Sequence, residues 1–345
     1  MIDHDLRIEA SAPIRVCDLG GWTDTWFARR GRVVNIGVSP RVHVKMDVRP
    51  TSRPAAVVVT LQNYRDQLEI TADTRPSGPH QLIEAAVVRM FPTEPCSIDM
   101  AVRSDAPPGA ATGTSASVCV AVLGALAALR GEGAMTPEQL AGVAHRVETD
   151  DLGAQSGIQD QLCAAHGGVI DIEIDEYPRS QQRRIALADT TAAAIDSGLS
   201  LIYLGRPHAS SAVHHMVIAG LERTGPDTPA LEDLRSAARR GVHALTEGDL
   251  VGFGQAMKAN TTAQRALHPG LVSPQAEVVG RRAEAFGALG WKVNGAGGDG
   301  GSLSILFLDP KAKREFESAI ASEHPSIRAV PTAISSGVEV AILDG

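Results

Sequence analysis

The chain has 345 residues, of which 43% are hydrophobic and 21% charged, and its formal net charge is -8 at pH 7. A chain longer than about 250–300 residues exceeds what one hydrophobic core usually supports, so we expect two domains. Lys and Arg form no long run, which argues against a nucleic-acid-binding protein because phosphate contacts need clustered cations. The N-terminus carries charges where a signal peptide needs an apolar stretch, so we expect no signal peptide. The chain has no long uninterrupted apolar stretch, so we expect no membrane span.

The cysteines are widely spaced and form no C-x-x-C pair. They are Cys17, Cys96, Cys119 and Cys163. This spacing is typical neither of a disulfide framework nor of a zinc site. We therefore expect a protein of a reducing, cytoplasmic compartment.

The first half of the chain mixes strand-like and helix-like patterns. Short apolar runs predict strands at 6–10, 33–36, 42–44, 57–60, 67–70, 97–102 and 169–172, the fourth and fifth forming a hairpin. Helical spacing predicts helices over 79–91, 115–129 and from 136 to about 150. The second of these is apolar on all sides and is expected to be buried. The third begins with Thr-Pro-Glu-Gln, which combines an N-cap with a capping box.

The polar stretch 176–185 is the expected domain boundary, which divides the chain into domains at 1–185 and 186–345. The second half predicts strands at 199–204 and 303–307 and helices at 208–223, 229–246, 248–258 and 273–289. Segregated runs of strands and helices indicate an α+β fold rather than a strictly alternating parallel sheet.

The segment 107–117, Pro-Pro-Gly-Ala-Ala-Thr-Gly-Thr-Ser-Ala-Ser, carries the strongest functional signal because it joins a strand to the buried helix. Its small residues let a ligand approach the backbone, and the free N–H groups at the helix start favour an anion. Thr114, Ser115 and Ser117 add hydroxyl groups. The segment is neither a Walker A loop nor a dinucleotide fingerprint, and a capped turn without a ligand is the alternative.

Two further glycine-rich segments, 11–24 and 290–301, and one acidic segment, 148–161, accompany this loop. Asp24 either accepts hydrogen bonds from a substrate or caps a turn, and Arg15 either meets a phosphoryl group or pairs with a surface acid. Two acids on separate elements can divide the binding of a divalent ion and the acceptance of a proton. The acids of this segment are Glu148, Asp150, Asp151 and Asp160, of which Asp150 and Asp151 are also expected as a solvated helix end. An acid in a glycine-rich turn is otherwise usually a turn residue.

Together, these segments resemble the GHMP kinases, whose phosphate loop reads P-x-G-x-G-L-x-S-S-A. The loop matches this pattern at Pro107, Gly109, Gly113, Ser115 and Ala116. It departs from the pattern at Ala111, Thr112 and Thr114. Residues 20–24, Gly-Gly-Trp-Thr-Asp, resemble the form found in fucokinases and heptose 7-phosphate kinases, and Asp299 interrupts a G-A-G-G-G-G pattern that begins at Gly295.

The resemblance implies a two-domain fold, with a ribosomal protein S5-like N-terminal domain and a ferredoxin-like C-terminal domain. It implies transfer of the γ-phosphoryl group of ATP to a sugar or sugar-phosphate hydroxyl, giving a sugar 1-phosphate, with Mg²⁺ held by Ser115 and Glu148. It further implies Asp160 as catalytic base beside Arg15. The implied ATP phosphate-binding residues are Pro108, Gly109, Ala110, Ala111, Thr112, Gly113, Thr114, Ser115 and Ala116. The implied substrate-binding residues are Thr23, Asp24, Gly157, Gly297 and Gly298.

The identity of the acceptor stays open at this point. A mevalonate-type kinase and a sugar-phosphate-binding protein without turnover are alternatives, and the protein is expected to be a monomer or a homodimer. If the acceptor is already phosphorylated, its phosphate would meet Arg29, Arg30, Arg32 or Arg41. The polar cluster His208, Ser210, Ser211, His214 and His215 is either a set of substrate contacts or a helix cap with exposed histidines.

Overall fold

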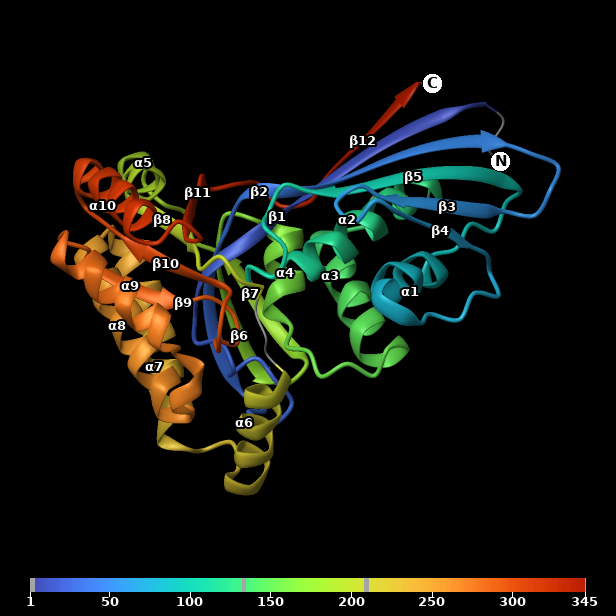
Figure 1. Cartoon of the computed structure of the whole chain (residues 1–345). Helices are drawn as coiled ribbons and strands as arrows, with labels where there is room; N and C mark the ends of the chain where they lie inside the picture. Colours follow the sequence, from blue (N-terminus) through green and yellow to red (C-terminus); the bar gives the residue numbers. More distant parts are fainter. Residues whose placement is uncertain (1–3, 132–134, 208–210, 345) are drawn as a thin grey trace.

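A computed structural model describes residues 4–131, 135–207 and 211–344 of the chain. Two sheets, each covered by helices, make up the molecule (Figure 1). The larger sheet has eight strands in the order β12-β1-β2-β5-β3-β4, with β6 beside β2 and β7 beside β6, and the smaller has the order β11-β8-β10-β9. This arrangement confirms the α+β class.

Two long strands, β1 (Leu6–Leu19) and β2 (Gly31–Pro50), form the centre of the large sheet. The other members are β3 (Ala56–Leu61), β4 (Asp66–Ile70), β5 (Cys96–Ser104), β6 (Val169–Glu176), β7 (Arg179–Arg184) and β12 (Glu339–Asp344). Because β1 is buried along its C-terminal half, it delivers Arg15 and Asp18 into the interior. The expected hairpin is confirmed by the pairing of β3 with β4.

Helices cover one face of the large sheet (Figure 1). The apolar helix expected at 115–129 is α2 (Thr114–Leu129), and its neighbours are α1 (Gln81–Arg89), α3 (Pro137–Arg146) and α4 (Gln159–His166). Most of α2 is buried, as its all-round apolarity predicts. The capping box at Thr136 is also confirmed, because its side chain accepts from Gln139 N and the Gln139 side chain accepts from Thr136 N.

One local detail differs from the expectation. The helix expected from 136 to about 150 ends at Arg146, and a wider π-helical turn, Val147–Asp151, follows it. The polar stretch 176–185, the expected domain boundary, contains strand β7, which pairs with β6 in an antiparallel hairpin. A polar, mostly exposed edge strand lacks the apolar alternation that identifies strands in a sequence.

The small sheet contains β8 (Leu199–Tyr203), β9 (Gly290–Val293), β10 (Ser302–Leu306) and β11 (Arg328–Val330). Its neighbouring helices are α5 (Asp189–Gly198), α6 (Ser211–Thr224), α7 (Pro229–Glu247), α8 (Leu250–Leu267), α9 (Pro274–Ala285) and α10 (Pro310–Glu323). One apolar cluster joins residues of β1 and β2 to residues of α7 and α8, so the two halves share a core. The last strand, β12, returns to pair with β1. The division at 185/186 stays a prediction.

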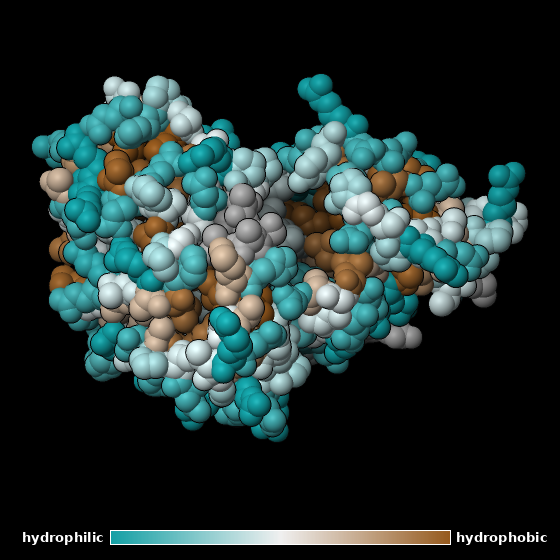
Figure 2. Space-filling model, turned by 60° about the horizontal axis from the view of Figure 1, so that its bottom comes forward, coloured by the Kyte–Doolittle hydropathy of each residue, from teal (hydrophilic) through white to brown (hydrophobic). Residues whose placement is uncertain are grey.

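None of the described helices is long and apolar enough to cross a lipid bilayer. Hydrophilic residues cover most of the face drawn in Figure 2, and hydrophobic residues are visible in a hollow near the middle of this face.

Helix α9 packs so closely on β9 that Gly280 has no room for a side chain: an added Cβ would lie 2.2 Å from the Trp291 ring. We expect Gly280→Ala to lower the free energy of unfolding by about 1–3 kcal/mol through overpacking. Gly220 in α6 is the matched control, because nothing lies within 4 Å of its added Cβ. Gly220→Ala should raise stability by about 0.5–1 kcal/mol. Urea unfolding measures both, and equal effects of the two substitutions would contradict the packing described.

Candidate active site

The loop between β5 and α2 lines a cavity of about 490 Å³. Three alternate residues of this loop, Gly109, Ala111 and Gly113, have φ of +66°, +57° and +66°. Such left-handed backbone favours glycine, and Ala111 adopts it although it stands where the related pattern has glycine. Ala111 therefore adopts the backbone conformation that glycine reaches most readily.

Helix α2 begins at the edge of this cavity. Its N-cap residue, Gly113, offers no side chain to the first-turn N–H groups. Those groups and the positive end of the helix dipole favour an anion. Thr114 and Ser115, the first residues of the helix, line the same cavity. The cavity wall thus has the features that a phosphate chain requires.

A second cavity, of about 340 Å³, adjoins the first. Five residues line both: Arg15, Ser115, Asp160, Gly295 and Ala296. The remaining lining of the second cavity is mostly polar, and comprises Trp22, Asp24, Thr25, Gln155, Ser156, Gly157 and Gln159. Two ligands could therefore meet at the shared residues.

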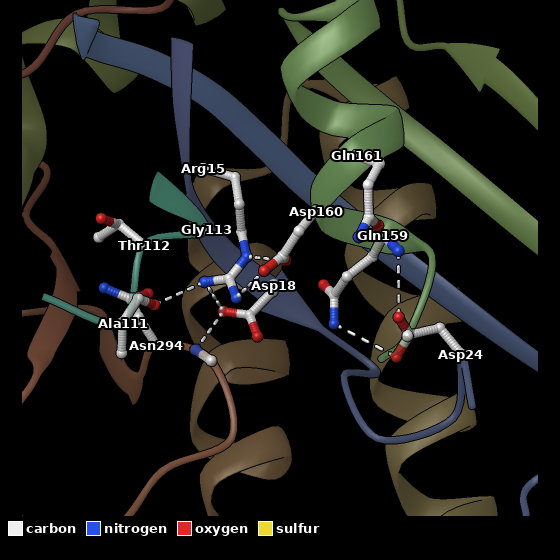
Figure 3. Close-up of polar contacts among 12 residues, drawn as sticks. Arg15, Asp18, Asp24, Ala111, Thr112, Gly113, Gln159, Asp160, Gln161 and Asn294 are labelled. Atoms are coloured by element: carbon white, nitrogen blue, oxygen red, sulfur yellow. Dashed lines mark hydrogen bonds and ion pairs between the residues drawn. The ribbon is translucent and has the colours of Figure 1, made fainter. Parts of the chain in front are cut away.

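At this junction Arg15 from β1 forms an ion pair with Asp160 from the first turn of α4 (Figure 3). Arg15 Nε donates to Asp160 Oδ1 over 2.7 Å, and Arg15 Nη1 donates to the Ala111 carbonyl over 2.8 Å. Burial lowers the pKa of Arg15, but the carboxylates of Asp160 and Asp18 raise it above its ordinary value. One side chain thus joins the loop between β5 and α2, expected to bind phosphate, to Asp160, the expected base.

Asp24 lies in the second cavity but is only 2% exposed. Its Oδ2 accepts from the N–H groups of Ile158 and Gln159 at the start of α4, over 3.0 and 3.1 Å (Figure 3). An added Cβ on Gly157 would lie 2.2 Å from the same oxygen, which explains glycine at that position. Asp24 therefore fixes the segment that carries Asp160, in addition to lining the cavity.

Glu148 lies in the wide turn after α3, with its Oε2 accepting from Ser156 Oγ over 2.6 Å. Burial raises the pKa of Glu148, and the Ser156 hydrogen bond lowers it. Its Oε1 is buried and has no hydrogen-bond partner among the described residues. Mg²⁺ takes oxygen ligands, often only one or two from protein with the rest from phosphates and water. The Glu148 carboxylate and the Ser115 hydroxyl are both ligand types that Mg²⁺ takes, but Glu148 lines neither cavity. Within the described chain no three His, Cys, Asp or Glu residues form a metal cluster.

Several residues expected at the site lie outside the lining of both cavities. Thr23 is fully buried, and its hydroxyl donates to the Gly20 carbonyl over 2.7 Å, so it stabilises the turn. Gly297 and Gly298 contact Leu271 instead, and the neighbouring Gly295 and Ala296 line the cavities. Ala116 is buried inside α2. The other expected residues, except Glu148, line one or both cavities.

The structure also brings in residues that the sequence motifs did not single out, chiefly Asp18, Lys292 and Gln159. The Asp18 carboxylate and the Lys292 ammonium form a buried ion pair of 2.9 Å behind Arg15. Gln159 Nε2 donates to Asp24 Oδ1 over 3.3 Å. Asp18 and Lys292 lie inside the glycine-rich segments 11–24 and 290–301. Their charges in otherwise apolar stretches were the sequence signal that could have identified them as functional residues.

The arginines considered for an acceptor phosphate are placed elsewhere. Arg30 pairs with Asp227, Arg32 pairs with Asp171, and Arg41 contacts the segment around Ser335. Arg29 is exposed and lines neither cavity. Among the described lining residues of the second cavity, Arg15 is the one Lys or Arg.

The remaining candidates contribute little to the site. Asp299 pairs with Arg206 on the surface, and Asp150 and Asp151 lie near Arg89. His208 and Ser210 lie outside the described residues, as do the side chains of Ser211 and His214, whereas His215 is exposed.

The buried Asp24 makes stability depend on pH. Burial raises the pKa of Asp24 from 3.8 to about 6. Because the folded state binds this proton more tightly than the unfolded chain, Asp24 favours folding below pH 4 and progressively loses that contribution as pH rises to about 6. In the wild type, this group should lower the unfolding free energy by up to about 3 kcal/mol between pH 4 and 6.5. Asp24→Asn should remove this decrease.

Urea unfolding at the two pH values checks this expectation, with the exposed Asp233→Asn as a control that should follow the wild type. An Asp24→Asn protein with the pH dependence of the wild type would show that Asp24 titrates normally.

Comparison with known proteins agrees with this geometry. The N-terminal domain of the GHMP kinases matches residues 81–168, which include the loop and α2. The chain is 22% identical over 326 residues to D-glycero-alpha-D-manno-heptose 7-phosphate kinase of Campylobacter jejuni, covering 92% of this chain and 94% of that protein. It is 29% identical over 228 residues to mevalonate kinase of Aeropyrum pernix, covering 66% of each.

A solved structure extends the likeness to the whole fold. A D-glycero-D-manno-heptose 1-phosphate kinase from Bacteriodes thetaiotaomicron superposes with a TM-score of 0.75 at 19% identity, covering 97% of this chain and 98% of that one. Residues 81–168 thus resemble the N-terminal domain of the GHMP kinases, and the whole chain shares the fold of a sugar-phosphate kinase.

Proposed function

We propose that the protein transfers the γ-phosphoryl group of ATP to a hydroxyl group of a sugar, at the junction of the two cavities. The observation that carries this proposal is the sharing of Arg15, Ser115 and Asp160 by both cavities. A phosphoryl donor in one cavity and an acceptor in the other would meet at these residues. Phosphoryl transfer depends chiefly on such positioning and on charge neutralisation.

ATP would occupy the first cavity, with its phosphates against residues 108–115. The N–H groups of the left-handed loop and of the first turn of α2 would donate to the phosphate oxygens. At the other end of the cavity, Tyr64, His80, Leu82 and Ile83 offer rings and apolar side chains. These suit a nucleotide base, because base binding relies on stacking and apolar contact.

Glu148 and Ser115 would hold Mg²⁺ next to the phosphates, with Glu148 supplying its partnerless Oε1. When bound, the ion would offset the negative charge of the transferring group. Ser156 orients the Glu148 carboxylate by donating to its other oxygen.

Asp160 would accept the proton of the attacking hydroxyl. Its carboxylate lies at the junction, and the two hydrogen bonds from Arg15 fix its orientation. A positioned carboxylate orients the attacking oxygen as well as accepting its proton. Arg15 also reaches the loop through Ala111, so it would lie close to the transferring phosphoryl group.

The second cavity fits a polyhydroxylated acceptor. Asp24, Gln155 and Ser156 can exchange hydrogen bonds with hydroxyl groups, and Trp22 offers a ring surface. The resemblance of residues 20–24 to sugar kinases supports reaction at the anomeric hydroxyl, which would give a sugar 1-phosphate. The described lining favours an unphosphorylated sugar, because Asp24 and Asp160 are acidic and Arg15 is already paired.

A mevalonate-type kinase is the second candidate, supported by the 29% identity with a mevalonate kinase. Mevalonate carries a carboxylate, for which the described lining offers no cation besides Arg15. A sugar-phosphate-binding protein without turnover would leave the orientation of Asp160 and the partnerless oxygen of Glu148 without a role.

An ADP-release screen with Mg-ATP distinguishes these candidates. We expect release with an aldose such as mannose, and release at least about tenfold weaker with the matched ester, mannose 6-phosphate. Release with mevalonate alone would favour the second candidate. Binding of ATP and sugar without any release would contradict the proposed enzyme.

Replacing the proposed base should affect turnover more than nucleotide binding. We expect Asp160→Asn to lower kcat by about 10²-fold or more, since general-base catalysis contributes about 10²–10⁴-fold. The KM for ATP should change little. Asp150→Asn, an exposed carboxylate on the turn before α4, is the matched control and should keep wild-type kinetics. A normal kcat in Asp160→Asn would remove its role as proton acceptor.

A further inference from the structure

A buried ion pair lies directly behind the proposed catalytic residues. Lys292 of β9 is 0% exposed, and its Nζ lies 2.9 Å from Asp18 Oδ1, which is also 0% exposed. Burial lowers the pKa of Lys292, and the Asp18 carboxylate raises it. Buried charges survive when they are paired, so each partner depends on the other for its ionised form.

Asp18 also faces Arg15. Arg15 Nη1 lies 3.6 Å from Asp18 Oδ1, while the Nε of the same guanidinium donates to Asp160 over 2.7 Å. Figure 3 shows the Arg15 guanidinium between the two carboxylates. The four side chains therefore form a charge-balanced row: Lys292, Asp18, Arg15 and Asp160.

The same Asp18 oxygen accepts from the N–H of Gly295 over 3.2 Å. Gly295 lines both cavities, and it follows the Lys292 strand by only a few residues. The row thus connects the wall formed by residues 290–301 with the phosphate loop that Arg15 reaches through Ala111. A change in Lys292 would alter the charges around Arg15 at the junction of the cavities, even though Lys292 lines neither of them.

We propose that Lys292 is a positioning residue for the transfer reaction: by neutralising Asp18, it leaves Arg15 bound to Asp160 and to the phosphate loop. This inference rests on the proposed function. Without the Lys292 ammonium, the nearest cation to the buried Asp18 carboxylate among the described residues is Arg15. Electrostatic attraction in a water-poor interior is strong, so Arg15 would move toward Asp18 and release Asp160.

The charge balance makes this proposal testable with single and double variants. Lys292→Met keeps most of the side-chain volume and removes the charge, and should lower kcat by about tenfold or more, because small displacements of catalytic groups have effects of that size. Asp18→Asn leaves Lys292 unpaired beside Arg15 and should also lower kcat. The double variant Asp18→Asn/Lys292→Met removes both charges together and should recover much of the lost kcat.

The readouts are kcat and KM for ATP, with thermal unfolding of each variant recorded alongside. We expect the changes in kcat to exceed those in the KM for ATP, because the N–H groups that would bind the phosphates belong to the loop backbone and the start of α2, and the Arg15 contact to this loop is at the Ala111 carbonyl. Lys258→Met is the matched control, since Lys258 forms an exposed pair with Glu284 in the same half of the chain. It should keep wild-type kinetics.

A purely structural role of the ion pair would make the double variant at least as damaged as the worse single variant, and that result overturns the proposal. A folded Lys292→Met protein with wild-type kcat overturns it as well. If Lys292→Met does not fold, the comparison of Asp18→Asn with the double variant carries the same test. A wild-type protein that releases no ADP with any acceptor contradicts the proposed function and this inference together. If the wild type is active, the variants test the role of Lys292 alone.

Discussion

The ion pair between Arg15 and Asp160 joins parts of the chain that are otherwise far apart. Arg15 comes from the central strand of the large sheet, and Asp160 from the first turn of α4. The same guanidinium bonds to the Ala111 carbonyl in the phosphate loop. Because one planar group serves both contacts, the loop and the carboxylate keep a fixed relation to each other. The proposed chemistry depends on that relation.

The phosphate loop depends on a backbone conformation more than on any particular side chain. Left-handed φ angles at Gly109, Ala111 and Gly113 direct the chain into α2 with its first N–H groups uncapped. Asp24 fixes the opposite wall by binding the N–H groups at the start of α4. Two helix starts therefore border the junction, one available for phosphate and the other already bound by a carboxylate.

Features set by short-range patterns could be predicted from the sequence. The all-round apolar stretch predicted the buried helix α2. The choice of Glu148 and Asp160 among the acids of their segment came from the resemblance to the GHMP kinases, and Asp160 lines both cavities whereas Glu148 lines neither. Features set by long-range pairing could not. The Asp18–Lys292 pair joins residues 274 positions apart, and the return of β12 to β1 has no local signal. In the C-terminal loop, tight packing of Gly297 on Leu271 places Gly295 and Ala296 at the cavities instead.

The central claim is that the terminal phosphates of ATP bind where α2 begins. A crystal structure with a non-hydrolysable ATP analogue and Mg²⁺ tests it most directly. The account predicts the terminal phosphate against the N–H groups of residues 113–115, next to Arg15 and Asp160. An analogue bound elsewhere, or a loop closed over by side chains with no phosphate density, would contradict it.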